Sequence, residues 1–277
     1  MRLKNVPANR GLVWAQLGVR TFMRRPIAFA ALLGAFVLCA FAAALVPFIG
    51  ALIGLALLPL VTLGFMLATR IVIDGGVPTP MVYLLPLRAQ RPRVISLVWL
   101  GVVYAAATFV ALWVSGIVDG GALAGLMQPV PEGQNPQEVL AKRLAEPGLF
   151  AGLMLRLGLT GLLSVPFWHA PALVYWDGQR VAQSLFSSTL ACWRNRGAFF
   201  VYGLAWAAFV MMFGTAASLV FTLIGSPELF AVAAVPISLI ITTVFYASLY
   251  FTFADSFSAS DDTPLSPVTT TPSGSSS

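Results

Sequence analysis

Two residues of this sequence combine a chemically active side chain with an apolar setting, Arg156 and His169. A guanidinium or an imidazole inside a membrane can bind an anion or relay a proton, so such residues are functional candidates. His169 is the only histidine of the chain. No cysteine, acid or second histidine is spaced to share a metal ion with it. We therefore expect no metal or cofactor, and we expect His169 to be a polar residue at the membrane interface.

The same region offers no catalytic pair. Ser164 stands five residues before His169, which does not place the two side chains on one helical face as nucleophile and base. Pro166 and Pro171 flank the histidine and predict a kinked or broken helix. Broken helices sometimes build binding sites, and proline kinks also serve plain packing. The sequence thus favours a non-enzymatic protein.

Arg156 has two alternative placements. If its helix enters the membrane near Pro147, Arg156 lies about 12 Å deep, at 1.5 Å of rise per residue. If the span begins at Leu157, Arg156 lies at the outer interface and extends its charge to water. The run from Leu157 to Trp176 has no charged residue and is long enough to cross a membrane, so we favour the interfacial placement.

A second candidate site consists of arginines beside apolar segments, where a guanidinium can attract an anionic lipid headgroup. They are Arg20, Arg24, Arg25, Arg91, Arg93, Arg194 and Arg196. The alternative is that these arginines only anchor the ends of spans. Because they flank spans and do not form a continuous basic surface, we expect membrane lipids as partners and no nucleic acid.

The elements that position these residues follow from composition. Hydrophobic residues make up 58% of the 277-residue chain and charged residues 9%, whereas soluble domains carry about 25% charged residues. Six charge-free runs are long enough to span a membrane as helices. We place them at about 27–46, 48–69, 94–118, 157–176, 198–224 and 229–254. The sequence predicts an all-α membrane domain over 1–257 and a disordered tail over 258–277, which is rich in Ser, Thr and Pro.

Charge asymmetry predicts the orientation. Most of the 16 lysines and arginines precede the first span or lie between spans two and three or four and five. Cytoplasmic loops are enriched in these residues. We therefore expect a multi-pass protein of the bacterial inner membrane with both termini in the cytoplasm.

The chain repeats one plan three times. A basic segment is followed by a helical hairpin, and each returning helix ends near an acid, at Asp74, Asp177 and Asp255. The segments 11–25 and 181–195 are amphipathic at helical spacing, the second more clearly. We expect both to lie as interfacial helices on the cytoplasmic surface.

Within the segment 181–195 the polar arc includes Gln183, Ser184 and Ser187. The apolar arc includes Leu185, Phe186, Leu190 and Trp193.

Several short stretches, at 22–29, 46–50, 63–66, 167–174 and 191–195, resemble the BPSS-type family of uncharacterised bacterial six-helix inner-membrane proteins. More loosely, the chain is similar to YciC-type membrane proteins and to the membrane domain of some glycerophosphodiester phosphodiesterases. The resemblance implies a helical membrane bundle. It supplies no catalytic residue.

Two functions remain open. The first is a non-enzymatic protein that organises lipids, anionic ones among them, or a partner, which could be another membrane protein or a second copy of the chain. The alternative is a small-molecule transporter or channel, although no intramembrane acid is present for ordinary proton or sodium coupling. A continuous polar cavity between spans four and five would favour transport, and a closed apolar bundle would favour the first function.

Reporter fusions test the topology. We expect fusions after Arg88, Arg180 and Ser277 to report the cytoplasm, because these residues belong to the basic loops and the predicted tail. A fusion at Gln134 should report the opposite side. A cytoplasmic signal at Gln134 would contradict the six-span arrangement.

Overall fold

The computed structural model describes residues 1–47, 49–126, 128–131, 133–225 and 229–258. Within these ranges six helical segments are long and apolar enough to cross a membrane. They are α2 (Pro26–Ala44), α3 (Gly50–Ile73), α4 (Arg91–Asp119), α7 (Pro147–Phe167) with its continuation to Asp177, α10 (Arg196–Leu223) and α11 (Leu229–Ser256). The predicted all-α membrane fold with six spans is confirmed.

Shorter elements connect these helices. They are β1 (Arg2–Leu3), α1 (Arg10–Arg24), η1 (Pro80–Leu84), η2 (Pro86–Arg88), α5 (Ala122–Leu126), α6 (Pro136–Leu144), α8 (Ala170–Ala172), the π-helical turn η3 (Leu173–Asp177), α9 (Val181–Arg194) and β2 (Phe257–Ser258). The two short strands pair antiparallel, with Arg2 opposite Ser258. Ser258, the first residue of the predicted tail, is therefore the last residue of β2. Residues 259–277 of the tail lie outside the described part of the chain.

Proline and glycine set several helix ends. Pro26 and Pro147 are the first residues of α2 and α7, where a missing N–H costs nothing. Gly120 ends α4 and Gly178 follows η3, both with the positive φ that glycine adopts easily, 59° and 70°. Because α7 starts at Pro147, the helix begins ten residues before the charge-free run at Leu157.

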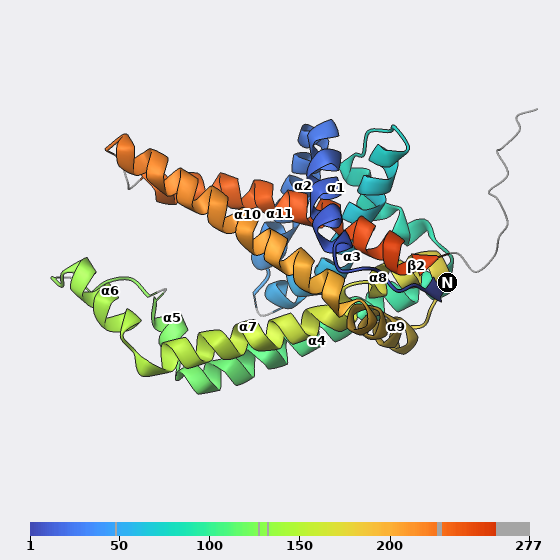
Figure 1. Ribbon diagram of the computed structural model, residues 1–277. Helices are drawn as coiled ribbons and strands as arrows, with labels where there is room; N and C mark the ends of the chain where they lie inside the picture. The colour runs from blue at the N-terminus through green and yellow to red at the C-terminus, as the bar shows by residue number, and fades with distance from the viewer. Residues whose placement is uncertain (48, 127, 132, 226–228, 259–277) are drawn as a thin grey trace, which may run out of the picture.

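The spans form hairpins that diverge from a common region (Figure 1). Helices α4 and α7 lie side by side, as do α10 and α11, and the two pairs separate with distance from α8, α9 and the N-terminus. The third hairpin is α2 and α3. We call the side where α2, α4 and α10 begin the basic end, after Arg24, Arg25, Arg91, Arg93, Arg194 and Arg196.

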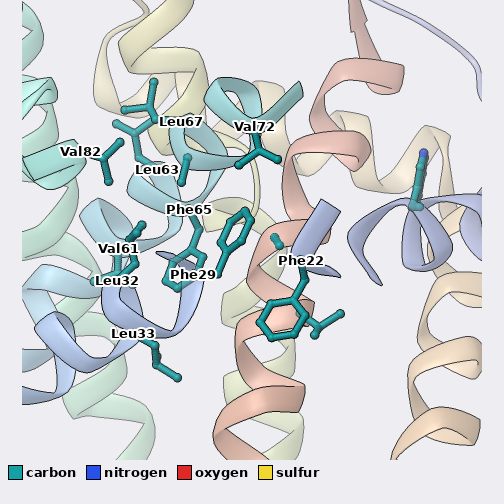
Figure 2. Close-up of a cluster of buried hydrophobic side chains, with 14 of the residues drawn as sticks. Phe22, Phe29, Leu32, Leu33, Val61, Leu63, Phe65, Leu67, Val72 and Val82 are labelled. Atoms are coloured by element: carbon teal, nitrogen blue, oxygen red, sulfur yellow. The ribbon is translucent and has the colours of Figure 1, made fainter. Parts of the chain in front are cut away.

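Stacked aromatic rings join the α2/α3 hairpin to α1 and α11. Phe29 lies between Phe22 and Phe65 (Figure 2), with ring centroids 6.3 Å from each. Phe65 in turn stacks on Tyr246 at 5.1 Å. Phe29 and Phe65 are fully buried. Offset aromatic pairs of this kind pack well without polar groups, which suits a lipid setting.

Helix α1 packs on the protein along one face. A side chain at Gly11 would overlap Ala198 of α10, and one at Gly18 would overlap Ser248 of α11, so the helices touch backbone to backbone. Arg20, on the opposite face, stays exposed. The amphipathic pattern predicted for 11–25 is present, but its buried face meets helices and not lipid alone.

A buried amide ties the chain termini to the start of α10. Asn195, 1% exposed, accepts a hydrogen bond from the backbone N–H of Val6 at 2.9 Å. Its amide donates to the Lys4 carbonyl at 3.2 Å and to Ser256 Oγ at 3.3 Å. One side chain thus joins three segments that are far apart in sequence.

An acid at the end of α11 makes a second connection. Asp255 Oδ2 accepts hydrogen bonds from Arg10 Nε at 2.8 Å and from Trp14 Nε1 at 2.7 Å. Asp177, at the end of η3, lies 2.8 Å from the amino group of Met1. Two of the three acids that end returning helices therefore bind the N-terminal segment.

Replacing the buried amide should weaken the whole bundle. In Asn195→Ala, the three groups that bond this amide are left without a hydrogen-bond partner in a buried place. The free energy of unfolding should fall by about 2–4 kcal/mol. We expect Tm in detergent to fall by roughly 5–10 °C. Asn5→Ala is the matched control, because Asn5 is exposed and, among the described residues, its side chain accepts only from Arg194. Equal Tm values for the two variants would contradict the structural role of Asn195.

Candidate functional site

The fourth span is broken at residues 168–169, between the end of α7 and the start of α8. Pro171 has no N–H to bond the carbonyl four residues earlier, so a regular helix cannot pass through this point. In an unbroken helix the N–H of His169 would bond the carbonyl of Val165. Here the hydroxyl of Ser188 lies between them, donating to Val165 O at 2.9 Å and accepting from His169 N at 3.0 Å. A side chain of α9 thus replaces the missing helical bond.

This contact fixes how α9 lies. Its buried face consists of small residues, among them Ser184, Ser188 and Cys192. The opposite face exposes Phe186 and Trp193, each 68% exposed. The exposed part of the predicted apolar arc is therefore Phe186, Leu190 and Trp193. Leu185 is half-buried and packs against the cluster of Leu100, Phe167 and Ala170.

The predicted polar arc of α9 is divided. Ser184 faces the protein, Ser187 is half-buried and Gln183 is exposed. Ser184 donates to the carbonyl of Val181 in its own helix at 2.8 Å. Ser188 is the serine that serves the broken span, because an interrupted helix inside a membrane needs polar partners.

His169 lies away from the surface that the sequence predicted. Its side chain is fully buried, with the rings of Phe199, Phe253 and Phe257 at centroid distances of 5.9, 5.9 and 5.5 Å. Neither ring nitrogen has a hydrogen-bond partner among the described residues. The break in the helix turns the imidazole inward beneath β2, which sequence spacing could not reveal.

The hydroxyl of Ser164 is bonded to the backbone of its own helix. Its hydroxyl donates to the carbonyl of Gly161 at 2.7 Å, as serines in helices often do. Within the described chain no group of three or more His, Cys, Asp or Glu side chains is placed to hold a metal ion. Burial raises the pKa of the Cys192 thiol to about 12, so this cysteine stays protonated and is a poor nucleophile at neutral pH.

A crevice of about 490 Å³ opens between the fourth and fifth spans. It is bounded by α7, α9, α10 and α11, and its walls are mainly rings. These belong to Trp168, Phe199, Phe200, Tyr202, Trp206 and Phe245. The crevice is open at Trp193 and Phe200, each 68% exposed, so it communicates with the surroundings of the bundle.

One charged side chain stands at the basic end of this crevice. Arg196 is exposed and lies over the ring of Trp193, with Cζ 5.5 Å from the ring centroid. This cation–π contact holds the guanidinium near the opening and leaves its N–H groups available. The combination of one cation and an apolar channel is suited to an amphipathic anion.

The predicted lipid-contact arginines differ in their partners. Arg93 is half-buried and donates from Nη1 to the carbonyl of Tyr175 at 2.9 Å, so it stabilises the end of the fourth span. The other six are exposed. These are Arg20, Arg24, Arg25, Arg91, Arg194 and Arg196. In the part of the chain that the structure describes, none of the six forms an ion pair.

Arg156 stands apart from this cluster. Its Nε donates to Ser115 Oγ of α4 at 3.2 Å. Ser115 lies 21 residues beyond Val94, about 32 Å along α4 and close to the thickness of a hydrocarbon core. Ser115 therefore lies toward the end of α4 opposite the basic end, while α7 begins at Pro147, nine residues before Arg156. The interfacial placement of Arg156 stays a prediction.

Removing the charge of Arg156 should have a small effect. In Arg156→Gln the bundle loses one hydrogen bond between helices, and such bonds contribute about 0.6 kcal/mol on average. We expect insertion and Tm to stay near wild type, with Asn195→Ala as the destabilised reference. A large loss of folded protein that a nearby acid restores would show instead that Arg156 is buried and paired.

The residues that sequence reasoning missed are mainly uncharged. Asn195, Ser188 and Trp206 gain their roles from segments distant in sequence. For Ser188 the sequence does contain a signal: Pro166 and Pro171 break a helix just before a serine-rich amphipathic segment, which could supply the missing polar partners. No comparable pattern marks Asn195 or Trp206.

Comparison with known proteins agrees with the fold. The chain is 34% identical over 263 residues to a protein of Burkholderia thailandensis that is described as a probable inner membrane protein. The match covers 93% of this chain and 94% of that protein. No family model matches the sequence, and no solved structure matches it. This chain is therefore a multi-pass inner-membrane protein, and it belongs to the same family as the Burkholderia protein.

Proposed function

We propose that this protein has a non-enzymatic role in which its basic end binds and organises anionic membrane lipids. The observation that carries the proposal is the five exposed arginines at this end, together with exposed Arg20 of α1, none of them in an ion pair within the described residues. An arginine near an anionic surface contributes about 1 kcal/mol, less at high salt. An arginine whose charge is already neutralised by an ion pair with an acid would attract an anionic lipid much less.

We further propose that the basic end and both termini face the cytoplasm. Positive-inside asymmetry supports this orientation, because the first span begins after Arg24 and Arg25 and the fifth after Arg194 and Arg196.

Helix α9 supports a membrane-surface role. Its face away from the protein exposes Phe186, Leu190 and Trp193, and Arg194 ends the helix. Tryptophan favours the interface, where its ring is apolar and its N–H finds a partner. We propose that α9 is embedded in the headgroup region with these side chains directed toward acyl chains.

The crevice between the fourth and fifth spans favours lipid over transport. Its walls are aromatic and aliphatic, whereas a path for a hydrophilic solute needs continuous polar groups. A membrane-protein partner or second copy remains an alternative occupant of the exposed apolar surfaces. We also propose that the protein is related to the BPSS-type family. A looser relation to YciC-type proteins and to the membrane domain of some glycerophosphodiester phosphodiesterases is likewise a proposal.

Lipid selectivity in proteoliposomes tests the proposed function. Spin-labelled phosphatidylglycerol and phosphatidylcholine would report how strongly the wild type prefers the anionic lipid at its surface. We expect Arg24→Gln/Arg25→Gln to reduce this preference at least about twofold, and high salt to have a similar effect. The matched control, Lys142→Gln/Arg143→Gln in α6, should leave it unchanged. Equal loss in both variants, or no preference in the wild type, would contradict the proposal.

A further inference from the structure

We propose that the crevice between α7 and α10 is a specific site for one anionic phospholipid, with the phosphate at Arg196 and one acyl chain along α10. This inference rests on the proposed lipid-binding function and assigns it a defined site. The occupant follows from the distribution of groups along the crevice, which is cationic at one end and apolar over the rest of its length.

The headgroup position is defined at the basic end. Arg196 is exposed, held over Trp193 and free of any ion pair within the described residues. A guanidinium binds phosphate through paired N–H groups. Trp193 beside it suits the boundary between headgroups and acyl chains.

The acyl-chain position follows one face of α10. Arg196, Phe199, Gly203 and Trp206 recur at intervals of three and four residues, so they line one side of the helix. From Arg196 to Trp206 this face is about 15 Å long. A side chain built at Gly203 would meet no atom within 4 Å, so this part of the crevice has room for an added group.

The deep end of the crevice is closed by Trp206, which is 8% exposed. A phospholipid with its phosphate at Arg196 keeps its glycerol esters near the basic end, so only acyl-chain carbons would reach this level. The indole ring offers such a chain an apolar surface.

The inner wall limits what can enter. Trp168 and Phe245 meet edge to face, with ring centroids 6.0 Å apart, and separate the crevice from the centre of the bundle. The hydroxyl of Tyr202 is already bonded to Ser248 at 2.6 Å. The crevice is thus a lateral recess with little polar surface, suited to a chain that enters from the membrane.

Titration of the purified full-length chain, in mild detergent, with dioleoyl-phosphatidylglycerol tests the site by native mass spectrometry. We expect one lipid to bind at least about tenfold more tightly than the next. Gly203→Trp fills the recess and should abolish this tight site. Gly214→Trp is the matched control, because Gly214 is also open, lies on the same helix and does not line the crevice. Gly203→Leu, a smaller insertion, gives the same test if the tryptophan variant does not fold.

The headgroup contact is tested separately. Arg196→Gln should weaken the tight site about fivefold for phosphatidylglycerol and leave dioleoyl-phosphatidylethanolamine unchanged. Arg20→Gln, which removes an exposed arginine outside the crevice, should have no effect on it. Glycerol 3-phosphate, a headgroup without a chain, should not compete.

Three results would overturn the inference. They are a tight site that persists in folded Gly203→Trp or Gly203→Leu, equal affinity of the wild type for both lipids, and competition by glycerol 3-phosphate. If any of these occurs while Arg24→Gln/Arg25→Gln still lowers the anionic preference, the crevice proposal fails and the wider function stands. The reverse pattern would remove the wider function and retain the site.

Discussion

The structure depends on a buried polar junction at one end of the bundle. Within lipid, hairpins with apolar surfaces gain little from association, because acyl chains solvate them as well as another helix does. At the basic end, Asn195 joins the start of α10 to both terminal segments, and Asp255 binds Arg10 and Trp14. The amide of Asn195 is 1% exposed and cannot stay unpaired away from water, and the half-buried Asp255 adds a charged contact beside it. They fix the hairpins at this end and allow them to diverge elsewhere.

The broken fourth span follows the same rule. Pro171 interrupts the helix, and the polar groups that it frees must find partners inside the protein. Ser188 supplies one by bridging Val165 and His169. This requirement brings α9 against the span with its small residues inward. The large apolar residues of α9 then point outward, which gives the protein a surface suited to the interface. The inward packing of α9 and its exposed apolar surface thus have one cause.

Divergence of the hairpins also creates the crevice. Because α7 and α10 belong to different hairpins, they are held together only near α9 and separate beyond it (Figure 1). The space between them is lined by rings and opens beside Arg196. Lipid is the solvent available to such a recess, and the neighbouring cation would select among lipids by charge.

The sequence by itself determined the solvent, the number of spans, the helical class and the positions of the arginines, since these depend on composition and run length. It also located the helix break, because proline acts locally. The tertiary structure alone decided which polar residues meet water and which meet protein. Ser184 and His169 look interfacial by spacing, yet both are buried, and Arg93 bonds a carbonyl while its six companions remain exposed. The outcomes for Arg93 and His169 depend on contacts between segments far apart in sequence, such as Arg93 with Tyr175, 82 residues away, which no local pattern records.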